Sequence, residues 1–171
     1  MVVTETSLEL RDFGCIASMQ MPPGWSAPPE DDPSSAPFAE MRFFPAYEKD
    51  TYVSVTYTRR PEDGSILQGI LSKPPHMLLF AEQNSLQYML GADFSAKSFR
   101  ALKIATEPWN HRMCIMIRGR WLNTQHDCLW LVTNRNEDCS SKQQVNFRIA
   151  QDHSIKFHPM ITRSLQSIAW R

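Results

Sequence analysis

Two histidine–cysteine pairs are the first residues whose spacing suggests chemistry. His111 lies three positions before Cys114, and His126 lies two positions before Cys128. Four such side chains could bind zinc, but a structural zinc site takes its ligands from tight loops, whereas three of these four lie on or beside predicted strands. The same cysteines could act as nucleophiles beside a histidine, yet cysteines buried in strands are generally inert. We therefore expect no metal site and no catalytic cysteine.

Other catalytic signatures are missing from the sequence. The acidic runs at residues 30–32, 62–63 and 137–138 fall in polar stretches and are typical of solvated turns rather than of acid–base pairs. Ser65 follows a glycine but lacks the second glycine of a nucleophile elbow. With only six glycines, the chain contains no Gly-rich loop of the doubly wound or P-loop nucleotide-binding type. We expect a protein that is not an enzyme and that needs no cofactor.

One segment combines flexible apolar, aromatic and cationic side chains at strand spacing. Residues 112–122 and 126–135 alternate with period two on either side of a short polar turn, so they predict a β-hairpin. If Thr124 is the centre of the turn, the numbers of cross-strand partners sum to about 248, which places Arg118 opposite Trp130. The candidate partner-binding residues on that face are Met116, Arg118, Arg120 and Trp130.

The opposite face of this hairpin holds the predicted core residues. They are Ile115, Ile117, Trp121, Leu129 and Leu131. Nine methionines is a high count, and methionine is common on surfaces that accept varied apolar partners. The alternative is that the methionines and tryptophans of the hairpin fill an ordinary core, because most apolar residues at strand period do so.

The first third of the chain is predicted to be extended and rich in loops. Residues 8–19 alternate with period two and predict one extended segment. Six prolines between residues 22 and 37 exclude a continuous helix or a central strand, so we expect a surface loop over 22–37, tethered by Trp25 packing on the core. Residues 38–44 and 52–58 predict an antiparallel hairpin.

Two helices are predicted in the remainder. After a stretch of turn composition at residues 59–64, residues 72–90 predict a middle helix with Ser72 as its N-cap and Gly91 as its stop. A C-terminal helix begins at about Ser154. Its apolar stripe is Phe157, Ile161, Leu165 and Ile168. The other predicted strands are residues 101–106 and 145–149.

Composition limits the class of protein. A chain of 171 residues with 42% hydrophobic and 21% charged residues can bury its own core, so a wholly disordered protein is excluded. No apolar run approaches the roughly 20 residues that span a bilayer. Residues 1–7 show no signal-peptide pattern, so we expect a cytoplasmic protein with reduced cysteines.

The charges are balanced overall but unevenly distributed. Residues 1–65 hold 5 basic and 11 acidic side chains, and residues 66–171 hold 13 and 7. Such a split can mark a basic half that binds a partner, but two halves that form one sheet would bring the opposite charges together. Because a basic excess is absent, we expect no nucleic-acid partner.

The order of the elements predicts a single α+β domain over residues 1–171, with a twisted antiparallel sheet of about seven strands, a middle helix and a C-terminal helix. The early strand that runs into Met21-Pro-Pro-Gly-Trp25, and the closing helix with Ile161-Thr-Arg-Ser-Leu165, resemble the PsbP-like and DcrB-like domains, a group that includes a Ran-binding nuclear import factor. The resemblance spans roughly residues 10–170. It implies a non-catalytic assembly factor, chaperone or adaptor.

The leading hypothesis is therefore a non-enzymatic protein-binding domain, adaptor or chaperone-like, that binds a protein or peptide on the hairpin face. A homodimer stays open. The alternative is a small-molecule carrier or enzyme of the helix-grip kind, with a cavity beneath the terminal helix. Nucleic-acid binding ranks lowest. It would use Arg112, Arg118, Arg120, Arg135 and Arg148.

Overall fold

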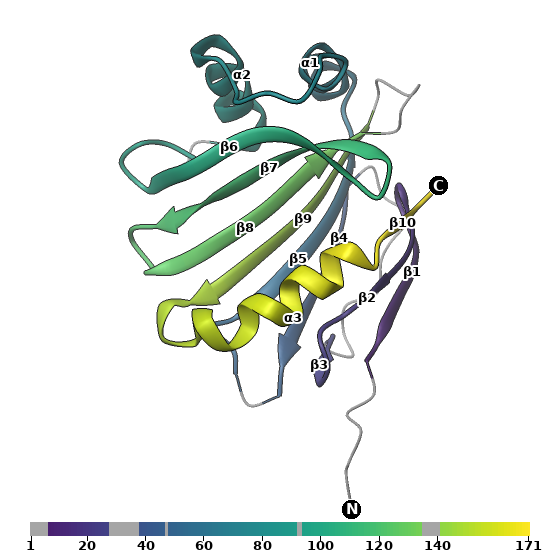
Figure 1. Cartoon of the computed structure of the whole chain (residues 1–171), viewed down its shortest axis with the longest axis vertical. Helices are drawn as coiled ribbons and strands as arrows, with labels where there is room; N and C mark the ends of the chain where they lie inside the picture. Colours follow the sequence, from purple (N-terminus) through teal and green to yellow (C-terminus); the bar gives the residue numbers. More distant parts are fainter. Residues whose placement is uncertain (1–6, 28–37, 47, 92–93, 135–140) are drawn as a thin grey trace, which may run out of the picture.

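An antiparallel sheet of seven strands organises the fold in the computed structural model, which describes residues 7–27, 38–46, 48–91, 94–134 and 141–171. Across the sheet the strands are β3 (Trp25–Ser26), β4 (Phe38–Pro45), β5 (Tyr52–Arg59), β9 (Ser141–Ala150), β8 (His126–Thr133), β7 (Arg112–Trp121) and β6 (Phe99–Trp109) (Figure 1). Every neighbouring pair is antiparallel. The predicted α+β class is confirmed.

The other elements form a small sheet and three helices. The small sheet contains β1 (Glu9–Phe13), β2 (Ile16–Gln20) and β10 (Ala169–Trp170). The helices are α1 (Pro61–Leu71), α2 (Phe80–Leu90) and α3 (Ser154–Gln166), the last preceded by a 3-10 turn, η1 (Gln151–His153). Among the described residues, the structure has no helix that is both long enough and apolar enough to cross a membrane.

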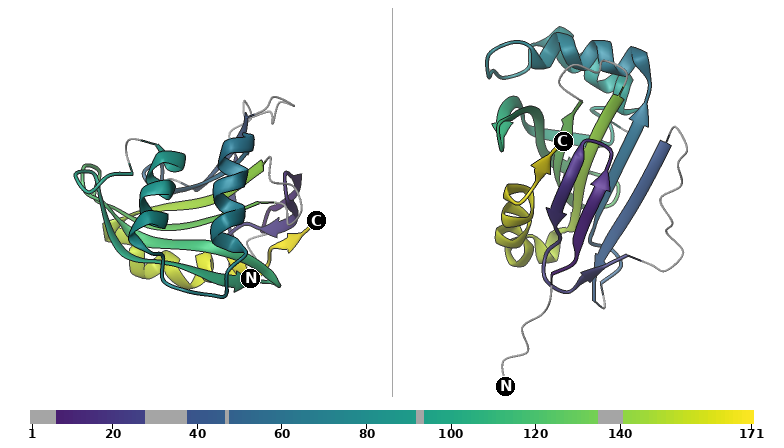
Figure 2. Two further views of the ribbon diagram at one scale, coloured as in Figure 1. Left: turned by 90° about the horizontal axis from the view of Figure 1, so that it is seen from above. Right: turned by 90° about the vertical axis from the view of Figure 1, so that its right-hand side faces the viewer.

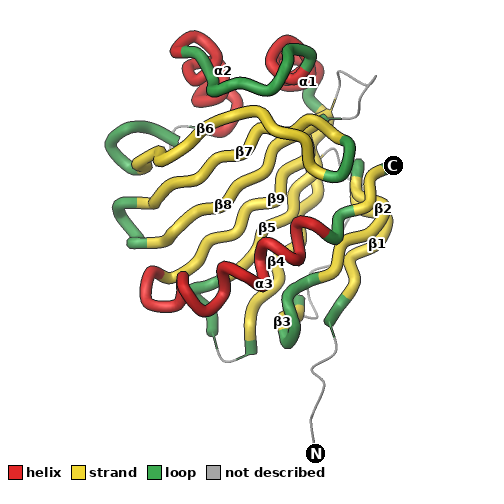
Figure 3. Tube along the Cα trace, viewed as in Figure 1, coloured by secondary structure: helices red, strands yellow, loops and turns green. Residues whose placement is uncertain are grey.

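The main sheet carries a separate apolar cluster on each face. Figure 2 shows from two further sides that α3 lies apart from α1 and α2. On one face, which we call the α3 face, Phe157, Ile161 and Leu165 of α3 pack with residues of β5, β9 and the small sheet. On the other, the α1/α2 face, Leu67 of α1 and Leu86 of α2 pack with residues of β6, β7 and β8. Figure 3 shows α1 and α2 together at one end of the sheet, away from α3. The expected burial of the α3 stripe is confirmed.

The register of the β7–β8 hairpin differs from the predicted one by one residue. Arg118 pairs with Leu129, and Ile117 pairs with Trp130. The cause is the turn, which takes four residues, 122–125, and closes with Gln125 in the left-handed region at φ 57°. Because side chains alternate between faces, a shift of one residue moves every β8 side chain to the other face relative to β7. The predicted pairing of Arg118 with Trp130 is therefore wrong. The predicted core residues Ile115, Ile117, Trp121, Leu129 and Leu131 are all buried, but they lie on two faces and not on one.

The middle of the chain holds two helices in place of one. The stretch predicted as a turn at residues 59–64 begins α1, because Pro61 fits the first helical position and Glu62 and Asp63 favour the first turn. Ser72 is the C-cap of α1, not the N-cap of the next helix. The predicted helix over 72–90 forms only from Phe80 onward, and Gly91 ends it as expected.

The opening segment is a hairpin rather than one extended strand. β1 and β2 are antiparallel and turn at Gly14, which has φ 60°. A side chain there would collide with Tyr57, so the turn requires glycine. Trp25 is buried against Phe147 and Phe157 in edge-to-face contacts, as its tethering role predicts. Residues 28–37 of the predicted proline-rich loop lie outside the described residues.

Candidate functional site

The four predicted partner-binding residues do not share one surface. Met116, Arg118 and Arg120 alternate along β7 and point to the α3 face, whereas Trp130 of β8 belongs to the cluster on the α1/α2 face. Met116 is fully buried, and Trp130 is 6% exposed and donates a hydrogen bond from Nε1 to Gln144 Oε1 at 3.0 Å. Of the four, the two arginines are the ones with accessible charge.

Two further cations on β6 complete a basic surface around these arginines. Arg100 pairs directly with Arg120, and Lys103 pairs directly with Arg118. All four side chains lie on the α3 face, at the end of the sheet formed by β6 and β7. We call Arg100, Lys103, Arg118 and Arg120 the basic strip.

A β-bulge explains why sequence periodicity misses half of the basic strip. The register shifts between Ala101 and Lys103, so Leu102 is an extra residue with no partner on β7. Under strict alternation, Arg100 and Lys103 would point to opposite faces. With one residue inserted between them, they point to the same face. The only signal in the sequence is the density of cations itself.

The basic strip places like charges directly across two strands. Such pairs are destabilising, by an amount comparable to the roughly 0.2–1 kcal/mol of a favourable cross-strand pair. Arg120 Nε is neutralised by Asp127 Oδ1 at 2.9 Å, and Lys103 Nζ lies 3.8 Å from Glu107 Oε2. Arg100 and Arg118 make no hydrogen bond or ion pair with a described residue. The strip therefore has unpaired positive charge to offer an anionic partner.

The outer edge of β6 is partly closed to strand addition. The segment before α2 runs antiparallel along it: the N–H of Leu78 donates to the Ile104 carbonyl at 3.0 Å, and the N–H of Thr106 donates to the His76 carbonyl at 2.8 Å. The bulge at Leu102 interrupts the ladder further along. Because covered and bulged edges resist pairing with another chain, a partner is expected to contact the side chains of the strip.

A buried carboxylate holds this edge segment in place. Glu82 accepts hydrogen bonds from the Leu79 N–H at 2.9 Å, from His76 Nε2 at 2.9 Å and from Lys73 Nζ at 3.1 Å. Burial opposes its ionisation, but these donors prevail and lower the pKa of Glu82 to about 2. The Pro74 carbonyl and Glu82 together raise the pKa of His76. The cluster fixes the segment that borders the basic strip.

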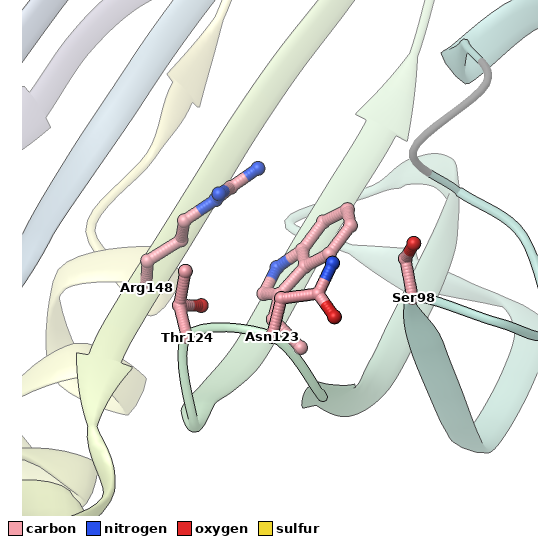
Figure 4. Close-up of a pocket in the computed structure, with 5 residues that line it drawn as sticks. Ser98, Asn123, Thr124 and Arg148 are labelled. Carbon is pink, nitrogen blue, oxygen red and sulfur yellow. The ribbon is translucent and has the colours of Figure 1, made fainter.

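A hollow of about 200 Å³ lies beside the turn between β7 and β8, next to Trp121 of the α1/α2 face. Figure 4 shows Ser98, Asn123, Thr124 and Arg148 around it. The Arg148 guanidinium carbon lies 4.2 Å from the centre of the Trp121 ring and makes no hydrogen bond with a described residue. Small-molecule sites typically enclose about 300–1,000 Å³, so this hollow suits a single anionic group better than a substrate or a cofactor.

A larger groove of about 500 Å³ runs between α3 and the segment that follows β2. Met21, Pro22, Met160 and Arg163 are among the residues that line it. Arg163 is its one charged lining residue, and the other polar ones are Ser7, Gln20 and Ser164. It is an external feature, distinct from the cavity beneath the terminal helix that a helix-grip protein would need.

The cysteines considered as zinc ligands or nucleophiles do not lie together. Cys114 faces the α3 cluster and Cys128 the α1/α2 cluster, so the two cannot share a site. Burial raises the pKa of each thiol to about 12, which leaves almost no thiolate at neutral pH. Within the described ranges, no three His, Cys, Asp or Glu side chains are placed to hold a metal ion. Cys139 lies outside those ranges.

The five arginines considered for nucleic-acid binding do not form one surface either. Arg112 is buried, donates to the carbonyls of Asn134 and Arg171, and stacks on Trp170. It therefore fastens the C-terminal segment. Arg148 belongs to the face opposite the basic strip, and Arg135 lies outside the described residues.

A solved structure with the same arrangement is the solution structure of cyanobacterial PsbP (CyanoP) from Synechocystis sp. PCC 6803. The two structures align over 99% of this chain and 95% of that chain, with a TM-score of 0.62 and 13% sequence identity. The likeness establishes a PsbP-like fold, as the resemblance predicted. No protein-family model and no curated protein matches the sequence.

Proposed function

We propose that this PsbP-like domain is a non-enzymatic binding module that holds an acidic segment of a partner protein on the basic strip. The observation that carries the proposal is the direct opposition of like charges, Arg100 with Arg120 and Lys103 with Arg118. An arrangement that costs stability in the isolated domain is relieved when carboxylates of a partner lie over it.

The geometry of the strip supports a protein partner rather than a nucleic acid. Its four cations occupy two neighbouring strands, and two acidic side chains, Glu107 and Asp127, lie among them. A phosphate backbone would be repelled by those carboxylates and would normally require a larger basic excess than this neutral chain has. A short acidic segment can place its carboxylates over Arg100 and Arg118 alone.

Affinity capture with charge-reversed variants tests the proposal. The wild-type protein, the double variant Arg100→Glu/Arg118→Glu and the control Lys49→Glu are each used as bait, and captured molecules are identified by mass spectrometry. Lys49 is an exposed cation in the β4–β5 connection and is not one of the four cations of the strip. We expect an acidic protein that the wild type and the control capture and the double variant loses.

Three results would overturn the proposal. They are retention of the same protein by the double variant, capture of nucleic acid in place of protein, and recovery of the domain with a bound small molecule. The last result would support the carrier alternative and direct attention to the space around α3.

A further inference from the structure

One arginine side chain faces the hollow beside the β7–β8 turn. Among the described residues that line it, Arg148 of β9 is the one that carries a charge. Arg148 lies on the α1/α2 face, because it pairs with Cys128 of β8, whose side chain belongs to the cluster on that face. Figure 4 shows Arg148 on one side of the hollow and Ser98 on the other, with Thr124 and Asn123 between them. The hollow therefore brings one cation and three neutral polar side chains together.

The ring of Trp121 holds the Arg148 guanidinium at this hollow. The guanidinium carbon lies over the ring, 4.2 Å from its centre, within the range of a favourable cation–π contact. Trp121 is itself fixed, since it is 6% exposed and its ring centre lies 4.8 Å from that of Phe99 and 6.1 Å from that of Trp130. A guanidinium that lies over a fixed ring keeps the N–H groups at its rim free to donate. Less conformational freedom is then lost when an acceptor binds.

The polar groups of the hollow are not satisfied by the described part of the protein. Arg148 makes no hydrogen bond or ion pair with a described residue, and neither do the three neutral polar side chains. Trp121 Nε1 is buried without a well-formed hydrogen bond to a described residue, and the adjoining thiol of Cys128 is a weak acceptor. The hollow therefore presents several donors and one uncompensated positive charge.

One carboxylate, Glu40 of β4, interacts with Arg148 through charge alone. Glu40 Oε1 accepts hydrogen bonds from Arg42 Nε at 2.7 Å and from Ser54 Oγ at 2.7 Å. Burial opposes the ionisation of Glu40, but these two donors lower its pKa, with a smaller contribution from the Arg148 charge. Because Glu40 is bound to Arg42, it leaves the guanidinium of Arg148 open to an external anion.

We infer that the hollow binds a single oxyanion group, a carboxylate or a phosphate, in contact with the Arg148 guanidinium. Both groups match a guanidinium, because its planar fork donates parallel hydrogen bonds to a pair of oxygens. The side chains of Ser98, Asn123 and Thr124 can donate to the remaining oxygens. The volume of about 200 Å³ limits the occupant to one such group. The inference is independent of the proposed function, since the hollow and the basic strip lie on opposite faces of the sheet.

Titration with inorganic phosphate and with acetate, at constant ionic strength set by chloride, tests the inference by proton–nitrogen NMR. The indole N–H signal of Trp121 and the Nε–H signal of Arg148 report on the hollow directly. We expect both signals to shift and to saturate. Saturation with both ions assigns the site to either group, and saturation with one ion alone narrows it to that group. Absence of a saturable shift with either ion would overturn the inference.

Variants identify the residue that binds the anion. Arg148→Gln should bind at least about tenfold more weakly, because hydrogen bonds to a charged group contribute that much. Lys156→Gln is the matched control, since Lys156 is an exposed cation over the Phe157 ring of α3 and does not line the hollow. It should bind as the wild type does. Unchanged affinity in Arg148→Gln would overturn the inference.

A second variant keeps the test decisive if Arg148→Gln does not fold. Glu40→Gln removes the negative charge that competes for Arg148, so it should bind phosphate more tightly than the wild type. Weaker binding by Glu40→Gln, in a protein whose backbone spectrum is that of the folded wild type, would contradict the inference.

Discussion

Lys142 of β9 and Asp63 of α1 form a buried ion pair that joins the helices to the sheet. Lys142 Nζ lies 2.7 Å from Asp63 Oδ2, and the two side chains are 6% and 2% exposed. The same ammonium group donates to the Met89 carbonyl of α2 at 3.0 Å. One cation thereby fixes both helices relative to β9.

Removing one member of this pair is expected to be costly. Asp63→Ala leaves the Lys142 charge buried with only a carbonyl as its acceptor, so we expect a loss of about 3–5 kcal/mol in the free energy of unfolding measured by urea titration. The double variant Asp63→Leu/Lys142→Met, which removes both charges, should recover most of that loss. A single variant within about 1 kcal/mol of the wild type would show that the pair is solvated.

Trp130 is expected to act as a core residue. It packs edge-to-face against Phe94 and lies beside Trp121 in the cluster on the α1/α2 face. Trp130→Ala should therefore lower the free energy of unfolding by about 3–5 kcal/mol. Arg118→Ala, an exposed change on the other face, should stay within about 0.5 kcal/mol. A Trp130→Ala protein that melts with the wild type and loses partner binding would restore the sequence-based assignment.

The fold could be predicted from alternation and helical spacing, but the site could not. Trp25, the α3 stripe and the β4–β5 hairpin lie as expected because each depends on local patterning alone. The prediction of which face each β8 side chain occupies relative to β7 assumed that Thr124 is the centre of the turn. The turn takes four residues and ends at Gln125, which places every β8 side chain on the opposite face from the predicted one.

The basic strip depends on tertiary structure in the same way. Arg100 and Lys103 share a face only because the bulge inserts Leu102, and no periodic pattern reports a bulge in advance. The start of α1 was hidden by Pro61 and Gly64, which have turn composition although proline also suits a first helical turn. At the bulge and at the start of α1 alike, the local sequence fits more than one local structure, so the pattern alone does not select the observed one.

A trade of stability against binding is expected at Arg118. Arg118→Glu replaces a like-charge pair with Lys103 by an opposite-charge pair. We expect the free energy of unfolding to rise by about 0.2–1 kcal/mol, because opposite charges directly across two strands are favourable. Thermal and urea unfolding measure this change. A clear loss of stability would mean that Arg118 has a structural role in the isolated domain.

The His76–Glu82 cluster predicts a defined pH dependence of stability. The pKa of Glu82 falls from 4.5 to about 2 on folding, so its contribution is present above pH 4.5 and is lost as the pH falls toward 2. The pKa of His76 is raised from 6.5, so its contribution is complete below pH 6.5 and is lost as the pH rises through the folded value. The cluster therefore stabilises most between pH 4.5 and 6.5.

Variants of both residues isolate this dependence. Unfolding curves from pH 2 to 9 should show that Glu82→Gln removes the loss on the acidic side and His76→Gln the loss on the alkaline side. Wild-type and variant curves that run parallel over the whole range would contradict the assignment.

The central claim is that the basic strip binds acidic protein segments. The most direct measurement is calorimetric titration of a glutamate-rich peptide into the wild type, Arg100→Glu/Arg118→Glu and Lys49→Glu at low and high salt. The account predicts that the double variant loses at least about tenfold in affinity, equivalent to about 1.4 kcal/mol, and that salt weakens the wild type and the control alike. Equal affinity of all three proteins would contradict it.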